Sequence, residues 1–249
     1  MDFSRMSKMS KLIGARGLYL SFCRSLRINP RPIQVPIFGT IRTLPEIMNL
    51  HDNFGMEHLR DEKIERHLAQ KSTPCVIDCG VNVGITVRWW FHLNPRASVF
   101  GIDMMQEAQA FTVASIQSLW AAEGGYEPIV AALWSESGKQ FTINVGNPLW
   151  GENSLYQPGA EQHGRVVITK TLDEIVDGEQ IGEIDLLKID LEGAGGDALK
   201  GATRTLQKTK HICFEIHGEE ECKLAGKILA DHQFALRRIS DRNLWWERE

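Results

Sequence analysis

The chain has 249 residues, of which 43% are hydrophobic and 24% are charged. These shares are ordinary for a globular protein, and they suffice for one sizeable core with an extension. The net charge of −4 argues against a chain that binds nucleic acid along its whole length, and no stretch approaches the roughly 20 apolar residues of a membrane span.

Charge is distributed unevenly along the chain. In the first 31 residues only Asp2 opposes seven basic residues, which are Arg5, Lys8, Lys11, Arg16, Arg24, Arg27 and Arg31. This segment therefore carries a net charge of +6, and the other 218 residues carry −10. The basic start is either a solvated arm or a segment that contacts an anionic membrane surface.

The five cysteines indicate a reduced protein. They are Cys23, Cys75, Cys79, Cys213 and Cys222, and three of them lie in apolar, strand-like runs where a free thiol behaves as a small hydrophobe. Their spacing contains no CxxC pair. We therefore expect a cytoplasmic protein without a zinc site.

The first 70 residues predict an extension. Residues 1–28 form a partly helical basic arm, which the prolines of Asn29-Pro-Arg-Pro32 end because proline cannot continue a regular hydrogen-bond ladder. Gln34–Thr40 predicts a short strand, and Pro45–Gln70 predicts a largely helical segment. We expect residues 1–70 to form an arm and a helical lid, and residues 71–249 to form the main domain.

From residue 75 onward, strands and helices alternate. The expected strands are Cys75–Cys79, Ser98–Ile102, Pro128–Leu133, Ile184–Asp190 and His211–Ile216, with paired segments at Phe141–Val145 and Arg165–Lys170 and at Phe234–Ile239 and Asn243–Glu247. The expected helices are Thr86–Leu93, Gln106–Ala122, Thr171–Val176, Asp197–Thr209 and Glu219–His232. Alternation of this kind predicts an α/β fold with a doubly wound, mostly parallel sheet, whose site lies beyond the carboxyl ends of the strands.

A glycine loop follows the first of these strands. In Val76-Ile-Asp-Cys-Gly-Val-Asn-Val-Gly84, Gly80 allows a tight turn and Gly84 allows the next helix to pack closely. The pattern is Gly-x-Asn-x-Gly and not the Gly-x-Gly-x-x-Gly of dinucleotide folds. It is typical of sites for S-adenosylmethionine, a cofactor without a pyrophosphate. We expect Asp78, Gly80, Asn82 and Gly84 to contact it.

The end of the second strand supports this cofactor. Asp103 ends that strand, where a carboxylate can accept both ribose hydroxyls, and Met104 can lie on the adenine face.

Lys188 stands within a central strand and needs a buried anionic partner. Strand alternation offers Asp190 on the same face, and Asp78 or Glu215 are the alternatives.

The sequence resembles the FkbM family of S-adenosylmethionine-dependent methyltransferases over about residues 72–240. The matching pieces are the glycine loop, Thr171-Leu-Asp-Glu-Ile175, Asp185-Leu-Leu-Lys-Ile-Asp-Leu-Glu-Gly-Ala194, Leu199-Lys-Gly-Ala202 and Phe214-Glu-Ile-His217. The resemblance implies a Rossmann-like class I methyltransferase with a seven-stranded sheet. It also implies O-methylation of a small-molecule or sugar hydroxyl. The chain departs from the family pattern at Gly195, where the family has an acid, and at Asp103-Met104, where it has Glu-Pro.

Methylation of a hydroxyl needs a base and an acceptor site. His217 is our first choice of general base, because its ordinary pKa is near neutrality, with Asp190 and Glu215 beside it. Asp190 can instead hold the ammonium group of the cofactor. A less favoured alternative is a divalent metal held by Asp190, Glu192 and His217.

The long loop before Arg165 is our candidate acceptor site, since long loops in compact domains are often functional. Its candidate contacts are Trp150, Asn153, Ser154 and Tyr156, with His163 as a second base. The rival functions are a nicotinamide-dependent oxidoreductase, which the missing Gly-x-Gly-x-x-Gly disfavours, and a non-catalytic binding protein. A homo-oligomer is compatible with the sequence.

Overall fold

The computed structural model describes residues 3–117, 124–156 and 164–249. In these ranges seven strands form the central sheet, in the order β11-β12-β10-β9-β3-β4-β5. The strands are β3 (Cys75–Cys79), β4 (Ser98–Asp103), β5 (Gly125–Val130), β9 (Ile184–Ile189), β10 (Thr209–Glu215), β11 (Phe234–Ser240) and β12 (Asn243–Arg248). β12 runs antiparallel to β10 and β11, and the remaining pairs are parallel. The predicted mostly parallel, doubly wound sheet is confirmed.

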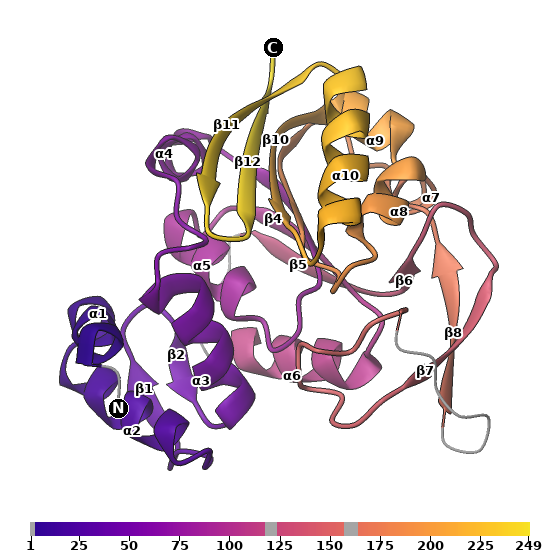
Figure 1. Cartoon of the computed structure of the whole chain (residues 1–249). Helices are drawn as coiled ribbons and strands as arrows, with labels where there is room; N and C mark the ends of the chain where they lie inside the picture. Colours follow the sequence, from indigo (N-terminus) through magenta and orange to yellow (C-terminus); the bar gives the residue numbers. More distant parts are fainter. Residues whose placement is uncertain (1–2, 118–123, 157–163) are drawn as a thin grey trace.

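Helices cover both faces of the sheet, because each strand presents apolar side chains to both sides. On one face Ile77, Leu187 and Ile212 pack in a core beneath α7 (Leu172–Gly178), α8 (Gly195–Lys200), α9 (Thr203–Lys208) and α10 (Glu219–Asp231). On the other face Val76 and Leu186 pack beneath α4 (Glu62–Gln70), α5 (Ile85–Leu93) and α6 (Gln106–Gln117). Figure 1 shows the two layers on opposite sides of the sheet.

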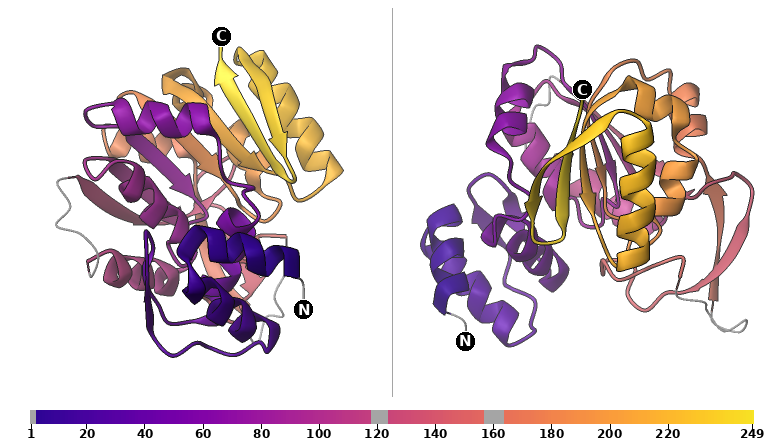
Figure 2. Two further views of the ribbon diagram at one scale, coloured as in Figure 1. Left: turned by 90° about the vertical axis from the view of Figure 1, so that its left-hand side faces the viewer. Right: turned by 45° about the horizontal axis from the view of Figure 1, so that its top comes forward.

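The first part of the chain adds a helical unit beside this second face. It contains α1 (Phe3–Ile13), α2 (Ala15–Ser25), the hairpin of β1 (Ile33–Val35) and β2 (Gly39–Ile41), α3 (Leu44–Leu50) and the π-helix η1 (His51–Gly55). The views of Figure 2 show α1 and α2 at the outer end of this unit, farthest from the sheet. Its apolar side chains join the core beneath α5.

A buried ion pair joins this unit to α5. The guanidinium of Arg88 lies 2.7 Å from Glu46 on α3, and both side chains are completely buried. Arg88 also donates to the carbonyl of Phe38, at 3.0 Å, and to that of Val83 in the glycine loop, at 3.3 Å. Arg88 thus links the N-terminal unit to the loop that follows β3.

A small second sheet lies beside the main one. β8 (Gly164–Lys170) pairs antiparallel with β7 (Gln140–Asn144) and parallel with β6 (Ala132–Leu133). The predicted pairing of residues 141–145 with 165–170 is therefore confirmed, as is the closing antiparallel pair, β11 with β12.

The largely helical segment expected at 45–70 is confirmed and consists of α3, η1 and α4. Three other predicted elements were wrong in their extent. The single strand expected at residues 34–40 is the hairpin of β1 and β2. The helix expected at 197–209 is broken into α8 and α9 by Gly201, where an added Cβ would lie 2.7 Å from the carbonyl oxygen of Trp134. The strand expected at 128–133 divides between the two sheets, as β5 and β6.

Candidate active site

The loops after β3 and β9 touch each other at the carboxyl edge of the sheet. An added Cβ at Gly80, whose φ is 83°, would lie 1.8 Å from the carbonyl oxygen of Asp190. The amide of Asp190 donates in turn to the carbonyl of Cys79, at 3.1 Å. Only glycine fits this crossing, because a side chain would meet backbone and the positive φ would strain it.

A pocket opens at this crossing. We call it the cofactor pocket, and its lining includes Gly80, Asn82, Asp103, Met104 and Asp190. Its empty volume is about 720 Å³, including the part that opens to solvent. Five of the residues predicted to bind the cofactor therefore line one pocket.

The carboxylate of Asp103 is held in place at the pocket wall. Its two oxygens accept the amide protons of Asn82 and Met105, each at 2.8 Å. Burial raises the pKa of Asp103, and these two amides oppose that shift. Each oxygen retains a further lone pair. The carboxylate is thus oriented to accept hydroxyl groups from a ligand in the pocket.

The other two residues predicted to bind the cofactor, Asp78 and Gly84, do not line the pocket. Asp78 is fully buried, accepts a hydrogen bond from the indole of Trp90 at 2.8 Å and lies 3.2 Å from Lys188. Gly84 begins α5 with φ of 70°, and an added Cβ would lie 2.5 Å from Thr112 on α6. Neither is in the pocket lining; they support the loop rather than face the ligand.

Lys188 fastens the two loops together. Its ammonium lies 3.2 Å from Asp78, 3.5 Å from Asp190 and 3.1 Å from the carbonyl oxygen of Gly80. Burial opposes the charge, but the two carboxylates outweigh it and raise the pKa of Lys188. The partners expected from strand alternation are therefore present.

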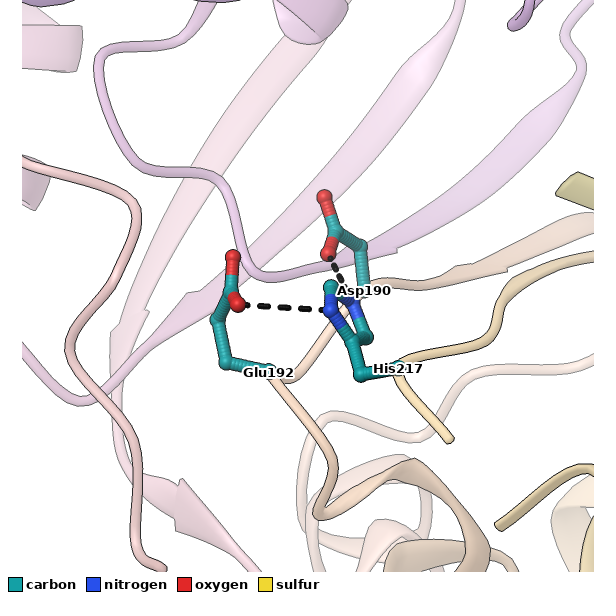
Figure 3. Close-up of side chains that lie close together, drawn as sticks. All are labelled: Asp190, Glu192 and His217. Carbon is teal, nitrogen blue, oxygen red and sulfur yellow. Dashed lines mark hydrogen bonds and ion pairs between the residues drawn. The ribbon is translucent and has the colours of Figure 1, made fainter. Parts of the chain in front are cut away.

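Figure 3 shows Asp190, Glu192 and His217 together at the ends of β9 and β10. The Nε2 atom of His217 lies 3.2 Å from Asp190, and its Nδ1 atom lies 3.3 Å from Glu192. One ligand atom from each side chain lies within 4.8 Å of the others, a spacing that a divalent cation can also bridge. The three residues named in the sequence for a base or a metal thus form one cluster.

The pKa values of Glu192 and His217 are both raised in this cluster. Burial, followed by the charge of Asp190, raises the pKa of Glu192 to about 7, although His217 opposes the shift. Burial lowers the pKa of His217, but its contacts with Asp190 and Glu192 outweigh burial and raise it. Shifted pKa values of this kind are typical of functional sites.

Glu192 is the member of the cluster that faces a ligand. Its side chain is 33% exposed, against 10% for His217. Glu192 and Asp190 line the cofactor pocket and an adjoining pocket, whereas His217 is in the lining of neither. The backbone of Glu192 has a φ of 49°, which is unusual for this residue type. The hydroxyl of Ser154 supports it by donating to its carbonyl, at 2.7 Å.

We call the adjoining pocket the acidic pocket. Its acidic lining residues are Asp52, Glu152, Asp190, Glu192 and Glu215, and its lining also includes Arg242. Arg242 lies 2.8 Å from Glu215. Burial and the charge of Asp190 raise the pKa of Glu215 to about 7, against the effect of Arg242. Glu215, which was predicted to be catalytic, therefore lines the acidic pocket and forms an ion pair with Arg242.

Only some residues of the predicted acceptor loop line the pockets. Trp150 lines both pockets and Asn153 lines the cofactor pocket, where its amide donates to the carbonyl of Trp150 at 2.7 Å. Ser154 is buried against Glu192. Tyr156 is exposed and donates to Asp197, away from both pocket linings. His163 lies outside the described residues.

Glu221 is a residue that the sequence analysis missed. One of its oxygens accepts the amide proton of Gly195 at 2.9 Å, and the other accepts that of His217 at 2.7 Å. An added Cβ at Gly195 would lie 2.7 Å from the ring of Phe214 and 3.0 Å from Glu221. The carboxylate of Glu221 thus stands beside the position where the family pattern has an acid.

The residues present fit S-adenosylmethionine. Asp103 offers acceptors for the ribose hydroxyls, and Met104 and Leu133 give an apolar wall for a base. The Oδ1 atom of Asn82 is buried without a hydrogen-bond partner among the described residues, and the residue lines the pocket. Buried polar atoms are rarely left unpaired, so Asn82 offers this acceptor to a ligand.

Replacing Asp103 with alanine is expected to weaken binding of S-adenosylhomocysteine by about 10- to 100-fold, because hydrogen bonds to a charged group contribute about 1.5–3 kcal/mol. Isothermal calorimetry measures the affinity. Asp177→Ala, at an exposed ion pair on α7, is the control and should bind as the wild type does. Unchanged affinity in Asp103→Ala would contradict the assignment.

Comparisons with known proteins identify similar structures at low sequence identity. No curated protein sequence matches the chain. Among solved structures, an FkbM methyltransferase from Methylobacillus flagellatus KT has a TM-score of 0.49 and 15% identity, over 93% of this chain and 59% of that chain. Magnesium protoporphyrin IX methyltransferase from Synechocystis PCC 6803, with bound S-adenosylmethionine, has a TM-score of 0.47 and 14% identity, over 92% and 91% of the two chains.

The family comparison covers most of the chain. The model described as "Methyltransferase FkbM domain" matches residues 47–242, a range that begins in α3 and includes the cofactor pocket, the cluster of Figure 3 and the acidic pocket. The chain therefore belongs to the FkbM family of S-adenosylmethionine-dependent methyltransferases.

Proposed function

We propose that this methyltransferase acts on a hydroxyl group of a small molecule or a sugar. The observation that supports this most is the acidic pocket, which adjoins the cofactor pocket and shares Asn82, Trp150, Asp190 and Glu192 with it. Ionised carboxylates are pure hydrogen-bond acceptors. A pocket with several of them is suited to an acceptor that carries many hydroxyl donors.

The bound cofactor supplies an activated methyl group on a sulfonium. Asp103, Asn82 and Asp190 would hold it, and Gly80 allows the two loops to cross beside it. The protein then has to align the acceptor oxygen and remove its proton. We assign proton removal to the pair formed by Glu192 and His217. Glu192 takes the proton from the acceptor, and His217 orients the carboxylate of Glu192 through its Nδ1 atom.

The N-terminal unit forms part of the acceptor site in this proposal. Asn49 on α3 lines both pockets, and Asp52 and Asn53 of η1 line the acidic pocket. The buried pair of Arg88 and Glu46 fixes α3 against the glycine loop. We therefore assign residues 1–70 to a wall or lid over the acceptor, in a separate role from the cofactor-binding part of the chain.

The function is tested with the purified chain, S-adenosylmethionine and a panel of sugars and hydroxylated small molecules. Formation of S-adenosylhomocysteine identifies an acceptor, and mass spectrometry of the product locates the methyl group. The proposal expects the methyl group on oxygen. Methylation on nitrogen or carbon, or calorimetric binding of NAD instead of S-adenosylhomocysteine, would overturn it.

The pH dependence tests the proposed base. Because the pKa of Glu192 is about 7, kcat should be constant above that pH and fall as the pH is lowered through it. His217→Gln removes a cation that lowers the pKa of Glu192, so the acid limb should move to higher pH. A limb that moves to lower pH, or a rate lost at every pH, would assign the proton transfer to His217 itself.

We also propose a cytoplasmic location. All five cysteines, each among the described residues, are free thiols, which suits a reducing compartment. Within the described residues, no helix has the length and apolar character needed to cross a bilayer.

A further inference from the structure

The outward face of α2 is apolar. Leu18, Phe22 and Leu26 follow one another at four-residue spacing, which places them on one side of the helix, and they are 44%, 46% and 53% exposed. Ile28 continues the apolar surface beyond the end of the helix. We call these four residues the α2 stripe.

The opposite side of α2 is already packed. Gly17 lies against the backbone of Met9, where an added Cβ would be 2.4 Å from a carbonyl oxygen, and Leu20 and Cys23 are buried in the core. The helix is therefore fixed in the fold by its other face. The stripe is not a loosely placed core element, and its exposure is a property of the folded unit.

Basic residues lie close to the stripe along the chain. Residues 7–31 contain six basic residues and no acidic ones, namely Lys8, Lys11, Arg16, Arg24, Arg27 and Arg31. Lys11, Arg16, Arg27 and Arg31 are exposed, and Arg24 lies 3.4 Å from Asp52. The segment that bears the stripe thus combines apolar side chains with a net positive charge, although the whole chain is acidic.

We propose that the α2 stripe docks on an anionic lipid bilayer. A helix that lies in the plane of a membrane buries an apolar face in the lipid boundary and places lysine and arginine among anionic headgroups. The stripe supplies the apolar face and the flanking basic residues supply the charge. The helix α2 also lies at the outer end of the molecule (Figures 1 and 2), where it can meet a flat surface.

This docking goes beyond the proposed function. It concerns where the enzyme works, and it does not depend on the base or the acceptor. The N-terminal unit that bears α2 also contributes Asn49 and Asn53 to the pocket walls. Docking would therefore hold the acceptor site close to the lipid surface.

The test is co-sedimentation of the full chain with vesicles of phosphatidylcholine alone or with added phosphatidylserine. We expect binding to the anionic vesicles that weakens as salt is raised. Leu18→Ser/Phe22→Ser/Leu26→Ser should reduce this partitioning by about 10-fold or more. Arg27→Glu/Arg31→Glu should reduce it by a factor on the order of 10. Circular dichroism and cofactor affinity report whether each variant remains folded.

Val166→Ser/Ile168→Ser is the matched control. These β8 residues are 59% and 58% exposed, but the basic residues beside them are paired, Arg165 with Glu107 and Lys170 with Glu174. The control should partition as the wild type does. Equal binding to both vesicle types, no binding to either, or an equal loss in the control would overturn the proposal. A triple variant that dissociates a dimer while its vesicle binding is unchanged would assign the stripe to a subunit contact.

Discussion

Replacing Glu192 with glutamine is expected to lower kcat by about 10²- to 10⁴-fold, the usual contribution of a positioned general base. Glutamine has nearly the same shape and still accepts a hydrogen bond from His217, but it cannot take a proton. Affinity for S-adenosylhomocysteine should change by less than about 10-fold, because Asp103 and the glycine loop are untouched. Initial rates with a saturating acceptor, together with calorimetry, measure the two effects.

Glu179→Gln is the control, since this exposed residue follows α7 and lies in neither pocket lining. It should retain the wild-type rate. If Glu192→Gln also retains the rate, Glu192 is not the base. A rate that a chelator abolishes and Mg²⁺ or Mn²⁺ restores would instead show that Asp190, Glu192 and His217 hold a cation, as their spacing permits.

The sheet could be predicted from the sequence because its strands are buried on both faces. Runs such as residues 75–79 and 184–189, which are mostly apolar and almost entirely buried, predict strands from their own sequence. The helices of the first 70 residues were harder to delimit. Asp61 caps α4 by accepting amide protons from Lys63 and Ile64, and this start signal was present in the sequence.

The cofactor-binding residues that belong to a local sequence pattern could be predicted. Gly80, Asn82 and Asp103 stand directly after strands, and the topology brings such positions together. The sequence did not distinguish Asp78, which supports the loop from within the sheet, from Asn82, which lines the pocket. That difference depends on strand alternation and on the partner Lys188, which is 110 residues away from Asp78 along the chain.

Contacts between distant elements account for what was missed. Arg88 and Glu46 lie on helices that the sequence does not pair, so their buried ion pair gave no local signal. Glu221 lies in the first turn of α10, where acidic residues are ordinary. Its contacts with Gly195 and His217 follow only from the packing of α10 against α8. Such residues require the three-dimensional structure.

Replacing Lys188 with methionine is expected to lower the free energy of unfolding by about 3–5 kcal/mol, the usual cost of removing one partner from a buried ion pair. Methionine fills much of the same volume but leaves Asp78, which is fully buried, without its cation. It also leaves the carbonyl oxygen of Gly80 without its donor. Urea denaturation measures the change, and a shift in the midpoint at a constant slope would identify it as a loss of stability.

The double variant Lys188→Met/Asp78→Asn separates charge from packing. Asparagine still accepts the hydrogen bond from Trp90, but it needs no cation, so the double variant should be more stable than Lys188→Met alone. If the two variants are equally unstable, the loss comes from the packing of the strand and not from the buried charge. Since Lys188 also binds the glycine-loop carbonyl, cofactor affinity should remain reduced in the double variant even where stability recovers. Recovery of stability without recovery of affinity would show that Lys188 stabilises the fold through Asp78 and shapes the cofactor loop through Gly80.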